Sequence, residues 1–421
     1  MRIERLLGCA CGAMLLSLAA YAADWPEWRG PQRNAVSNES GLLKEWPKEG
    51  PRLVWQVKDI GDGYATPSVA GNRIYVLSNR GLDNEFVQAL STQDGKQVWA
   101  TRLGKVGNPD QMPSFPAARS TPTVDGGLLY ALGSDGDLAC LEAASGRIRW
   151  RKSLRADFGG VSGKSGYTES PLVDGDALVV TPGGPQATMV ALNKRTGETI
   201  WKSAVPGGDD AAFASAIVVE SGGRRQYVQF LAKGLVGVDA KTGQFLWRYG
   251  ATGKGNTNIP TPVASGGYIY STQSHGPGGL IRLAAAGQGV AAEQVYLLRG
   301  LPSSIGGSVV IGETHYGTTG EGLVAADWTT GKVQWQEAGT GEGAILGVGD
   351  RLYIHGESGE VILAEATREA YRQQGRFMPP NRPKGTRGEM EKAWTYPVIA
   401  GGRLYIRELG SLWCFDIEKG V

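Results

Sequence analysis

The three histidines are the residues whose spacing first suggests a metal site. His275, His315 and His355 stand forty residues apart, and imidazole is a common ligand of zinc and other transition metals. Each histidine can be placed relative to the tyrosine in the second strand of its own repeat. His275 lies five residues after that tyrosine, His315 one residue before it and His355 two residues after it. Because these offsets direct the rings to different places, we predict no shared metal site.

Arg119 and Glu169 are the second chemical candidate. A guanidinium can hold an anion or a quinone, and a carboxylate can act as a base or a metal ligand. Both residues open neighbouring repeats, which places them to meet at the channel mouth. A structural ion pair or the lining of a water-filled channel is the leading interpretation, and a ligand-contacting arginine with a carboxylate as base or metal ligand is the alternative. The predicted ligand-binding set contains the polar and aromatic residues just ahead of the inner strands, namely Tyr64, Arg119, Tyr167, Glu169, Asn258 and Trp394.

Other catalytic signatures are missing from the sequence. It contains no G-x-S-x-G, H-E-x-x-H or EF-hand pattern, and its glycine-rich stretches at 182–185 and 276–279 do not precede a helix, so phosphate binding is not expected. Cys140 and Cys414 take the same place in repeats that are not neighbours, which predicts two buried small hydrophobic side chains rather than a disulfide. Catalytic residues therefore stay unassigned.

The elements that must position these residues are repeats. Residues 120–150 contain short apolar runs separated by turns and closed by a tryptophan, which predicts one four-stranded antiparallel sheet. The end of this unit recurs with the spacing A-x-D-x-x-T-G-x-x-x-W. The tryptophans to which we assign a structural docking role between sheets are Trp55, Trp99, Trp150, Trp201, Trp247 and Trp335.

Counting the repeats predicts an all-β, eight-bladed propeller of four-stranded antiparallel blades. The last repeat lacks its fourth strand, which residues 53–55 supply, so that an N-terminal strand closes the ring. Residues 284–296 lack the Thr-Gly turn, residues 367–377 suggest a short helical detour, and residues 378–392 suggest an exposed loop. The loops at 101–118 and 151–166 are longer than a hairpin needs, which favours a functional role.

The N-terminal region divides into two predicted segments ahead of the propeller domain, which is assigned to residues 53–421. Residues 1–22 have the basic start, short apolar core and small-x-small end of a cleaved signal peptide, which predicts a secreted or periplasmic protein rather than a membrane-spanning one. Residues 23–52 are predicted to form an extended strap anchored by Trp25, Trp28 and Trp46, with a binding platform as the alternative.

The composition and net charge of the chain limit the classes of partner that we expect. The 64 glycines suit many tight turns, and the formal net charge of +2 gives no reason to expect nucleic-acid binding. A closed ring has few free edges, so a monomer is expected.

The A-x-D-x-x-T-G-x-x-x-W motif resembles the tryptophan-docking repeat of the quinoprotein (pyrroloquinoline quinone, PQQ) dehydrogenase-like superfamily, and the chain is similar to its exported single-domain bacterial members. The resemblance implies an eight-bladed propeller. Alcohol dehydrogenases of that superfamily stack PQQ between a tryptophan and a disulfide of adjacent cysteines, beside calcium and a catalytic Asp. This sequence has no adjacent cysteine pair after residue 22, so PQQ with calcium is an open possibility only.

Two functions follow from the resemblance and remain open. The first is a non-catalytic binding or scaffold protein of the cell envelope, similar to the propeller of the outer-membrane assembly machinery, with a protein or small ligand on the channel face. The second is a PQQ-dependent oxidoreductase without the vicinal disulfide. Cell-surface polysaccharide binding through exposed aromatic residues is a third option.

Overall fold

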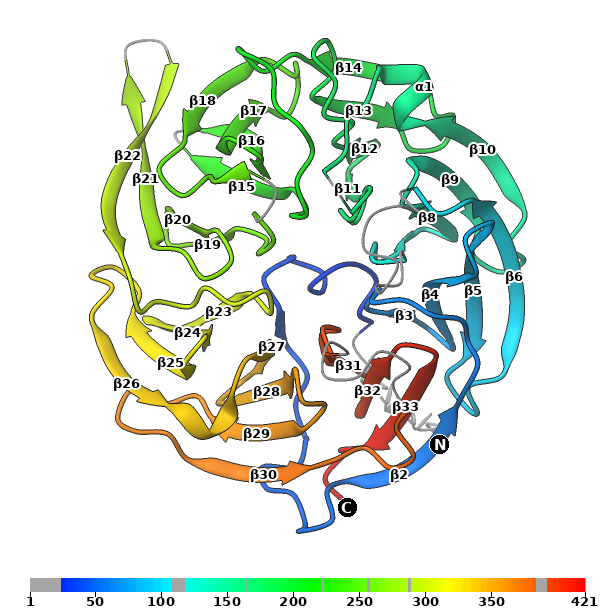
Figure 1. Ribbon diagram of the computed structural model, residues 1–421, viewed down its shortest axis with the longest axis vertical. Coiled ribbons are helices and arrows are strands. Elements are labelled where there is room, and N and C mark those ends of the chain that lie inside the picture. Colours follow the sequence, from blue (N-terminus) through cyan, green and yellow to red (C-terminus); the bar gives the residue numbers. More distant parts are fainter. Residues whose placement is uncertain are drawn as a thin grey trace, which may run out of the picture.

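The computed structural model describes residues 24–107, 118–163, 165–221, 223–255, 258–286, 289–383 and 392–420. The predicted signal peptide, most of the 101–118 loop and much of the 378–392 loop lie outside these residues. Figure 1 shows sheets arranged around a central axis, with the N-terminal segment in the middle of the ring. Within the described residues, no helix has the length and apolar character needed to span a bilayer.

The predicted eight-bladed propeller is confirmed: each blade is a four-stranded antiparallel sheet whose first strand lies nearest the axis. Blades 1 to 4 comprise β3 (Ser68–Ala70), β4 (Arg73–Arg80), β5 (Asn84–Ser91), β6 (Gln97–Gly104); β7 (Thr123–Asp125), β8 (Leu128–Leu132), β9 (Asp137–Glu142), β10 (Ile148–Ser153); β11 (Leu172–Asp174), β12 (Ala177–Val180), β13 (Met189–Asn193), β14 (Thr199–Ser203); and β15 (Ile217–Ser221), β16 (Arg224–Leu231), β17 (Gly234–Asp239), β18 (Phe245–Tyr249). A short helix, α1 (Leu154–Phe158), follows β10.

The remaining blades follow the same order, and blade 8 takes its outer strand from the N-terminal side of the chain. Blades 5 to 8 comprise β19 (Val263–Ser265), β20 (Tyr268–Thr272), β21 (Gly278–Ala286), β22 (Gly289–Leu298); β23 (Ser308–Ile311), β24 (Thr314–Thr319), β25 (Gly322–Asp327), β26 (Val333–Glu337); β27 (Gly343–Val348), β28 (Arg351–Gly356), β29 (Val361–Glu365), β30 (Gln373–Phe377); and β31 (Val398–Ala400), β32 (Arg403–Glu408), β33 (Ser411–Asp416), β2 (Arg52–Val57). The 3-10 helix η2 (Ala338–Thr340) follows β26.

Each outer tryptophan docks on the turn of the next blade. Trp99 of blade 1 donates its indole N–H to the carbonyl of Ala143 in the blade 2 turn at 3.1 Å, and Trp150 does the same to Lys194 of blade 3 at 3.1 Å. Trp55, Trp201 and Trp335 make the equivalent bonds. Trp247 bonds Gln226 of its own blade instead, because blade 5 replaces the motif turn with the long β21–β22 hairpin.

The small residue of the motif lies directly opposite the tryptophan. Trp150 pairs with Cys140 and Trp55 with Cys414, where other blades have alanine or glycine. A large side chain there would collide with the indole, since cross-strand neighbours lie close together. Both cysteines are buried and free, which confirms their interpretation as small hydrophobic side chains.

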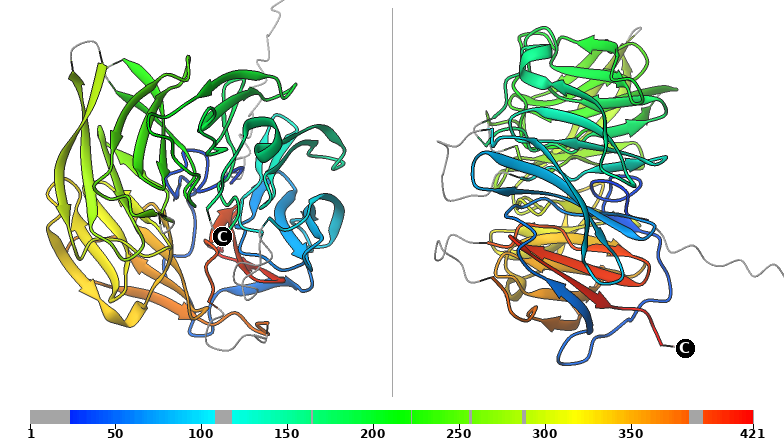
Figure 2. Two further views of the ribbon diagram at one scale, coloured as in Figure 1. Left: turned by 45° about the horizontal axis from the view of Figure 1, so that its top comes forward. Right: turned by 90° about the vertical axis from the view of Figure 1, so that its right-hand side faces the viewer.

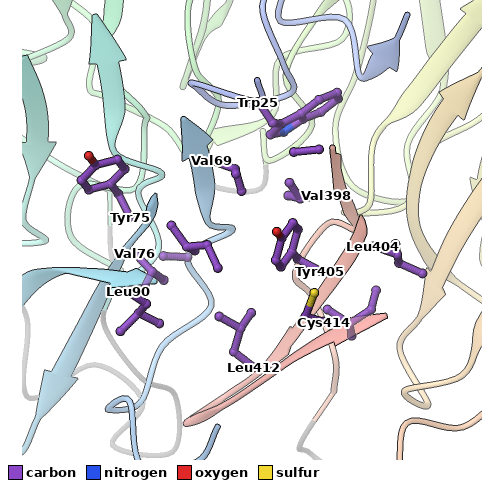
Figure 3. Close-up of a cluster of buried hydrophobic side chains, with 14 of the residues drawn as sticks. Trp25, Val69, Tyr75, Val76, Leu90, Val398, Leu404, Tyr405, Leu412 and Cys414 are labelled. Carbon is purple, nitrogen blue, oxygen red and sulfur yellow. The ribbon is translucent and has the colours of Figure 1, made fainter. Parts of the chain in front are cut away.

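Ring closure follows the prediction. Strand β2 pairs antiparallel with β33, from Arg52 opposite Asp416 to Val57 opposite Leu412. Buried Arg407 on β32 donates to backbone oxygens of blade 1 and its entry loop, at Ala65 (2.8 Å) and Leu77 (2.7 Å), and burial lowers its pKa to about 9. Figure 3 shows the apolar side chains of blades 8 and 1 in this cluster, with Trp25 beside them.

The helical detour predicted for residues 367–377 is wrong. Residues 367–372 form bends without a helix, and β30 then pairs with β29, from Ala364 opposite Gln373 to Val361 opposite Phe377. The outer edge of β29 would otherwise leave its backbone groups unpaired, and this ladder outweighs the local helix propensity of the segment.

The glycine of the docking turn can be tested against a matched glycine of the same blade. Gly146 and Gly126 both have positive φ, at 72° and 52°, but a Cβ at Gly146 would lie 2.4 Å from Trp99, whereas nothing lies within 4 Å of one at Gly126. We expect Gly126→Ala to cost about 1 kcal/mol from backbone strain, and Gly146→Ala about 2 kcal/mol more. Thermal unfolding of both variants measures the difference; equal losses would contradict tryptophan docking as the reason for this glycine.

Candidate functional site

The propeller places one residue of each blade at the mouth of the central channel. In blades whose inner strand opens with a Ser/Thr-Pro pair, this residue stands two positions before the pair. In the other blades it stands two positions before the residue that the strand pairing makes equivalent to that Ser or Thr. The chain is extended there, so these side chains point to the axis. The mouth residues that line one cavity are Tyr64, Arg119, Thr168, Phe213, Ile259, Ile305 and Trp394. The equivalent residue of blade 7 is Glu342, which binds His275 at 3.0 Å.

A second layer, one step deeper, ties the blades together through hydroxyl groups. The hydroxyl of Thr66 accepts a hydrogen bond from the backbone of Tyr396 in blade 8 at 3.1 Å. Ser170 accepts one from the backbone of Thr121, and Ser215 accepts one from the backbone of Ser170, each at 2.9 Å. The hydroxyl groups of this layer therefore satisfy the backbone of a neighbouring blade, a role that the repeat pattern alone did not reveal.

The N-terminal strap closes the channel from the side of the motif turns. Trp25 pairs with Val69 of blade 1, and Trp28 donates to the hydroxyl of Thr261 in blade 5 at 2.9 Å. Arg33 donates to the carbonyl of Ser170 in blade 3 at 2.7 Å. The strap thus spans the channel, and the views of Figure 2 show it on the same side of the disc as the C-terminus.

The strap then leaves along blades 7 and 8. Strand β1 (Val36–Ser37) adds parallel to β27, and the carboxylate of Glu39 accepts hydrogen bonds from the backbone of Gly401 and Gly402. Trp46 packs edge-on against Phe377 of blade 7, with ring centroids 5.3 Å apart. These contacts hold the segment at both ends.

A cavity of about 250 Å³ lies between the mouth and the strap. Trp28 and Tyr396 contact each other edge to face, with centroids 4.7 Å apart, at its deep end. On one wall the rings of Tyr64 and Trp394 lie 5.0 Å apart, and the guanidinium of Arg119 lies over Tyr64 at 6.0 Å. Phe213, Ile259 and Ile305 supply apolar surface from blades 4, 5 and 6, and the other lining residues are Thr66, Ser165, Thr168, Ser170 and Ser215.

Half of the predicted ligand-binding set lines this cavity. Tyr64, Arg119 and Trp394 do so; Tyr167, Glu169 and Asn258 do not. The second group lies one position away from a lining residue, and side chains alternate along an extended chain. Tyr167 donates its hydroxyl to the carbonyl of Pro182, and the Asn258 amide donates to the carbonyl of Leu231.

Arg119 and Glu169 do not meet, so that prediction is wrong. Glu169 is 3% exposed and accepts hydrogen bonds from the backbone of Thr181 and from Gln229. Burial raises the pKa of Glu169 to about 7, and the bonds from Thr181 partly offset the rise. Arg119 donates to the carbonyl of Ser165 at 3.2 Å and makes no ion pair with any residue that the structure describes.

The histidines lie in three separate environments. His315 is buried edge-on to Tyr270, with ring centroids 4.4 Å apart, and burial lowers its pKa to about 3. The Nδ1 atom of buried His355 lies 2.8 Å from the carbonyl oxygen of Thr395, and His275 is exposed. In the described part of the chain, no three His, Cys, Asp or Glu side chains gather as metal ligands would.

The cavity does not fit PQQ with calcium. PQQ carries three carboxylates, but Arg119 is the sole cationic side chain among the described residues that line the cavity. The same lining contains no carboxylate to hold calcium and no cysteine to stack on the quinone.

Sequence reasoning missed the apolar half of the site. Phe213 and Ile305 lie in repeats that lack the Ser/Thr-Pro pair, and Ile259 is neither polar nor aromatic, so none of the three belongs to the predicted set. An offset of two residues before the Ser/Thr-Pro pair identifies Ile259, ahead of Thr261-Pro262, but not Phe213 or Ile305. Trp28 gave no such signal, since its contact with Thr261 joins residues 233 positions apart.

The fold and the repeat define a PQQ-like eight-bladed β-propeller. A family model described as "Outer membrane protein assembly factor BamB" matches residues 30–108 and 83–337. The chain therefore belongs to this family of PQQ-like repeat proteins.

Individual relatives match only parts of the chain. The outer membrane protein assembly factor BamB of Salmonella typhimurium is 29% identical over 121 residues, which is 29% of this chain and 28% of that protein. The tetrathionate hydrolase of Acidithiobacillus ferrooxidans is 25% identical over 224 residues, 51% of this chain and 40% of that one. The match thus spans well under half of each relative.

Among solved structures, the quinohemoprotein alcohol dehydrogenase ADHIIG of Pseudomonas putida HK5 superposes with a TM-score of 0.64 at 14% identity, covering 95% of this chain and 81% of that one. At this identity the similarity establishes the fold alone.

The raised pKa of Glu169 predicts a pH dependence of stability. The carboxyl is protonated in the native state up to about pH 7 but ionises near 4.5 when unfolded, so its contribution falls as the pH rises from about 4.5 to 7, by about 3 kcal/mol in total. The melting temperature of Glu169→Gln should therefore fall less than that of the wild type between about pH 4.5 and 7. The exposed control Glu49→Gln should show the same fall as the wild type. Identical pH profiles for wild type and Glu169→Gln would contradict the assignment.

Proposed function

We propose that this protein is an exported, non-catalytic scaffold of the cell envelope that binds an envelope protein or a small ligand at the channel mouth. The observation that carries the proposal is the blind cavity, which offers one guanidinium, hydroxyl groups and aromatic surface. Glu169, the residue that we considered as a base, is turned away from it and bonded elsewhere. Such a lining suits recognition, which needs a few placed polar groups on an apolar wall.

The names of the relatives support a location in the cell envelope. Several of them are named outer membrane protein assembly factors, which favours a periplasmic location and a partner protein among envelope components. A monomer remains our proposal, because the closed ring leaves only short outer strands as edges.

Photo-crosslinking tests the binding face. A photoreactive phenylalanine analogue at Phe213, on the mouth ring, should form adducts with an envelope protein in cells of the natural host. The same analogue at Ile200, which is 51% exposed on the outer strand of blade 3, should form none. Equal adducts at both positions, or none at Phe213, would reject the channel mouth as a surface that binds a partner protein.

The competing function, a PQQ-dependent oxidoreductase, makes the opposite prediction in a titration. Because the cavity offers one cation for three carboxylates, we expect PQQ up to about 100 µM, with calcium, to leave both its absorbance and the melting temperature of the protein unchanged. Saturable binding that weakens in Arg119→Gln would restore the enzyme as the leading function.

A further inference from the structure

Arg119 makes no ion pair with any carboxylate that the structure describes. Its guanidinium is partly buried, donates to the carbonyl of Ser165 and lies over the ring of Tyr64. Glu85, the described carboxylate whose charge acts on Arg119, accepts hydrogen bonds from the backbone and hydroxyl of Ser134 instead of from the guanidinium. Glu169 accepts from Thr181. Burying a guanidinium without a paired anion costs free energy. An anionic ligand that pairs with Arg119 would offset this cost.

The hydroxyl groups of the cavity are also available as donors. The oxygens of Thr66, Ser170 and Ser215 each accept a backbone N–H. None of these three hydroxyls donates to another described residue, so each retains its hydrogen for a ligand. Together with Arg119, they give the cavity several hydrogen-bond donors and no carboxylate acceptor.

The opposite wall is apolar. In an eight-membered ring, blades 4 to 6 face blades 8, 1 and 2, so Phe213, Ile259 and Ile305 lie across the axis from Trp394, Tyr64 and Arg119. The volume of about 250 Å³ corresponds to roughly eight waters at about 30 Å³ each in the liquid.

We propose that the cavity binds a single carboxylate carried on an apolar or aromatic body, with the carboxylate at Arg119 and the hydroxyls and the body against Phe213, Ile259, Ile305 and Trp28. This inference rests on the proposed function, which makes the cavity the binding site. One guanidinium matches one carboxylate through two parallel hydrogen bonds. Two sources share this chemistry, the C-terminus of a polypeptide and a free organic acid.

The test compares an acid with its amide. The fluorescence of Trp28 and Trp394, and calorimetry, would follow titration of the mature protein with N-acetyl-glycyl-phenylalanine, with its C-terminal amide and with 3-phenylpropionate. We expect saturable binding of the acid and at least tenfold weaker binding of the amide, the size of a charge-assisted hydrogen bond. Tighter binding of the peptide acid than of 3-phenylpropionate identifies a polypeptide C-terminus as the source, and the reverse order identifies a free acid.

Variants locate the contact. Arg119→Gln should reduce the affinity for the acid to that for the amide, and Phe213→Ala should weaken both. Arg80→Gln is the matched control, because Arg80 also lies over an aromatic ring, that of Phe86 at 4.8 Å, but outside the cavity. It should change neither affinity.

Three results would overturn the inference: equal affinity for acid and amide, unchanged acid binding in Arg119→Gln, or no binding of any probe. The comparison of acid and amide uses the wild-type protein, so it decides the question even if a variant fails to fold. If no probe binds while Phe213 still crosslinks to an envelope protein, the carboxylate site is wrong and the scaffold function stands.

Discussion

The pairing of β2 with β33 is the interaction on which the rest of the structure depends. Each blade packs mainly against its two neighbours, so an unclosed ring would expose an edge on both blade 1 and blade 8. Closure fixes the ring at eight blades and thereby sets the width of the channel. It also anchors the strap, because residues 24–51 run from the channel directly into β2, and the end of the cavity is built from that strap.

The fold could be predicted because its contacts are repeated and local. The motif places a small residue opposite the tryptophan of its own blade. It also places a glycine against the tryptophan of the preceding blade, and both requirements are steric. Five full copies of the unit and three incomplete ones can be counted without knowing how the blades meet. The failure at residues 367–377 fits this account, since that segment lacks the motif and its conformation is decided by the free edge of β29.

The site was less predictable, for two physical reasons. Along an extended chain, a displacement of one residue reverses the direction of the side chain, and this separates Tyr167 and Glu169 from the cavity that Thr168 lines. The floor comes from Trp28, whose position follows from the path of the strap rather than from any repeat. Residue type alone therefore identified only three side chains of the cavity lining, those of Tyr64, Arg119 and Trp394.

Comparison of the blades with one another shows how one repeat can serve both structure and binding. In the deeper layer five of the eight positions are serine or threonine, because a hydroxyl there joins one blade to the next. At the mouth, two residues earlier, the blades carry an aromatic, a cation, a hydroxyl or an aliphatic side chain. The recurring hydrogen bonds between blades come from the deeper hydroxyl groups. The mouth side chains make contacts that vary from blade to blade, such as that of Thr168 with the carbonyl of Phe213, so their types can differ around the ring while the ring stays closed. The asymmetry of the cavity, polar at blades 1 to 3 and apolar at blades 4 to 6, is a consequence of that freedom.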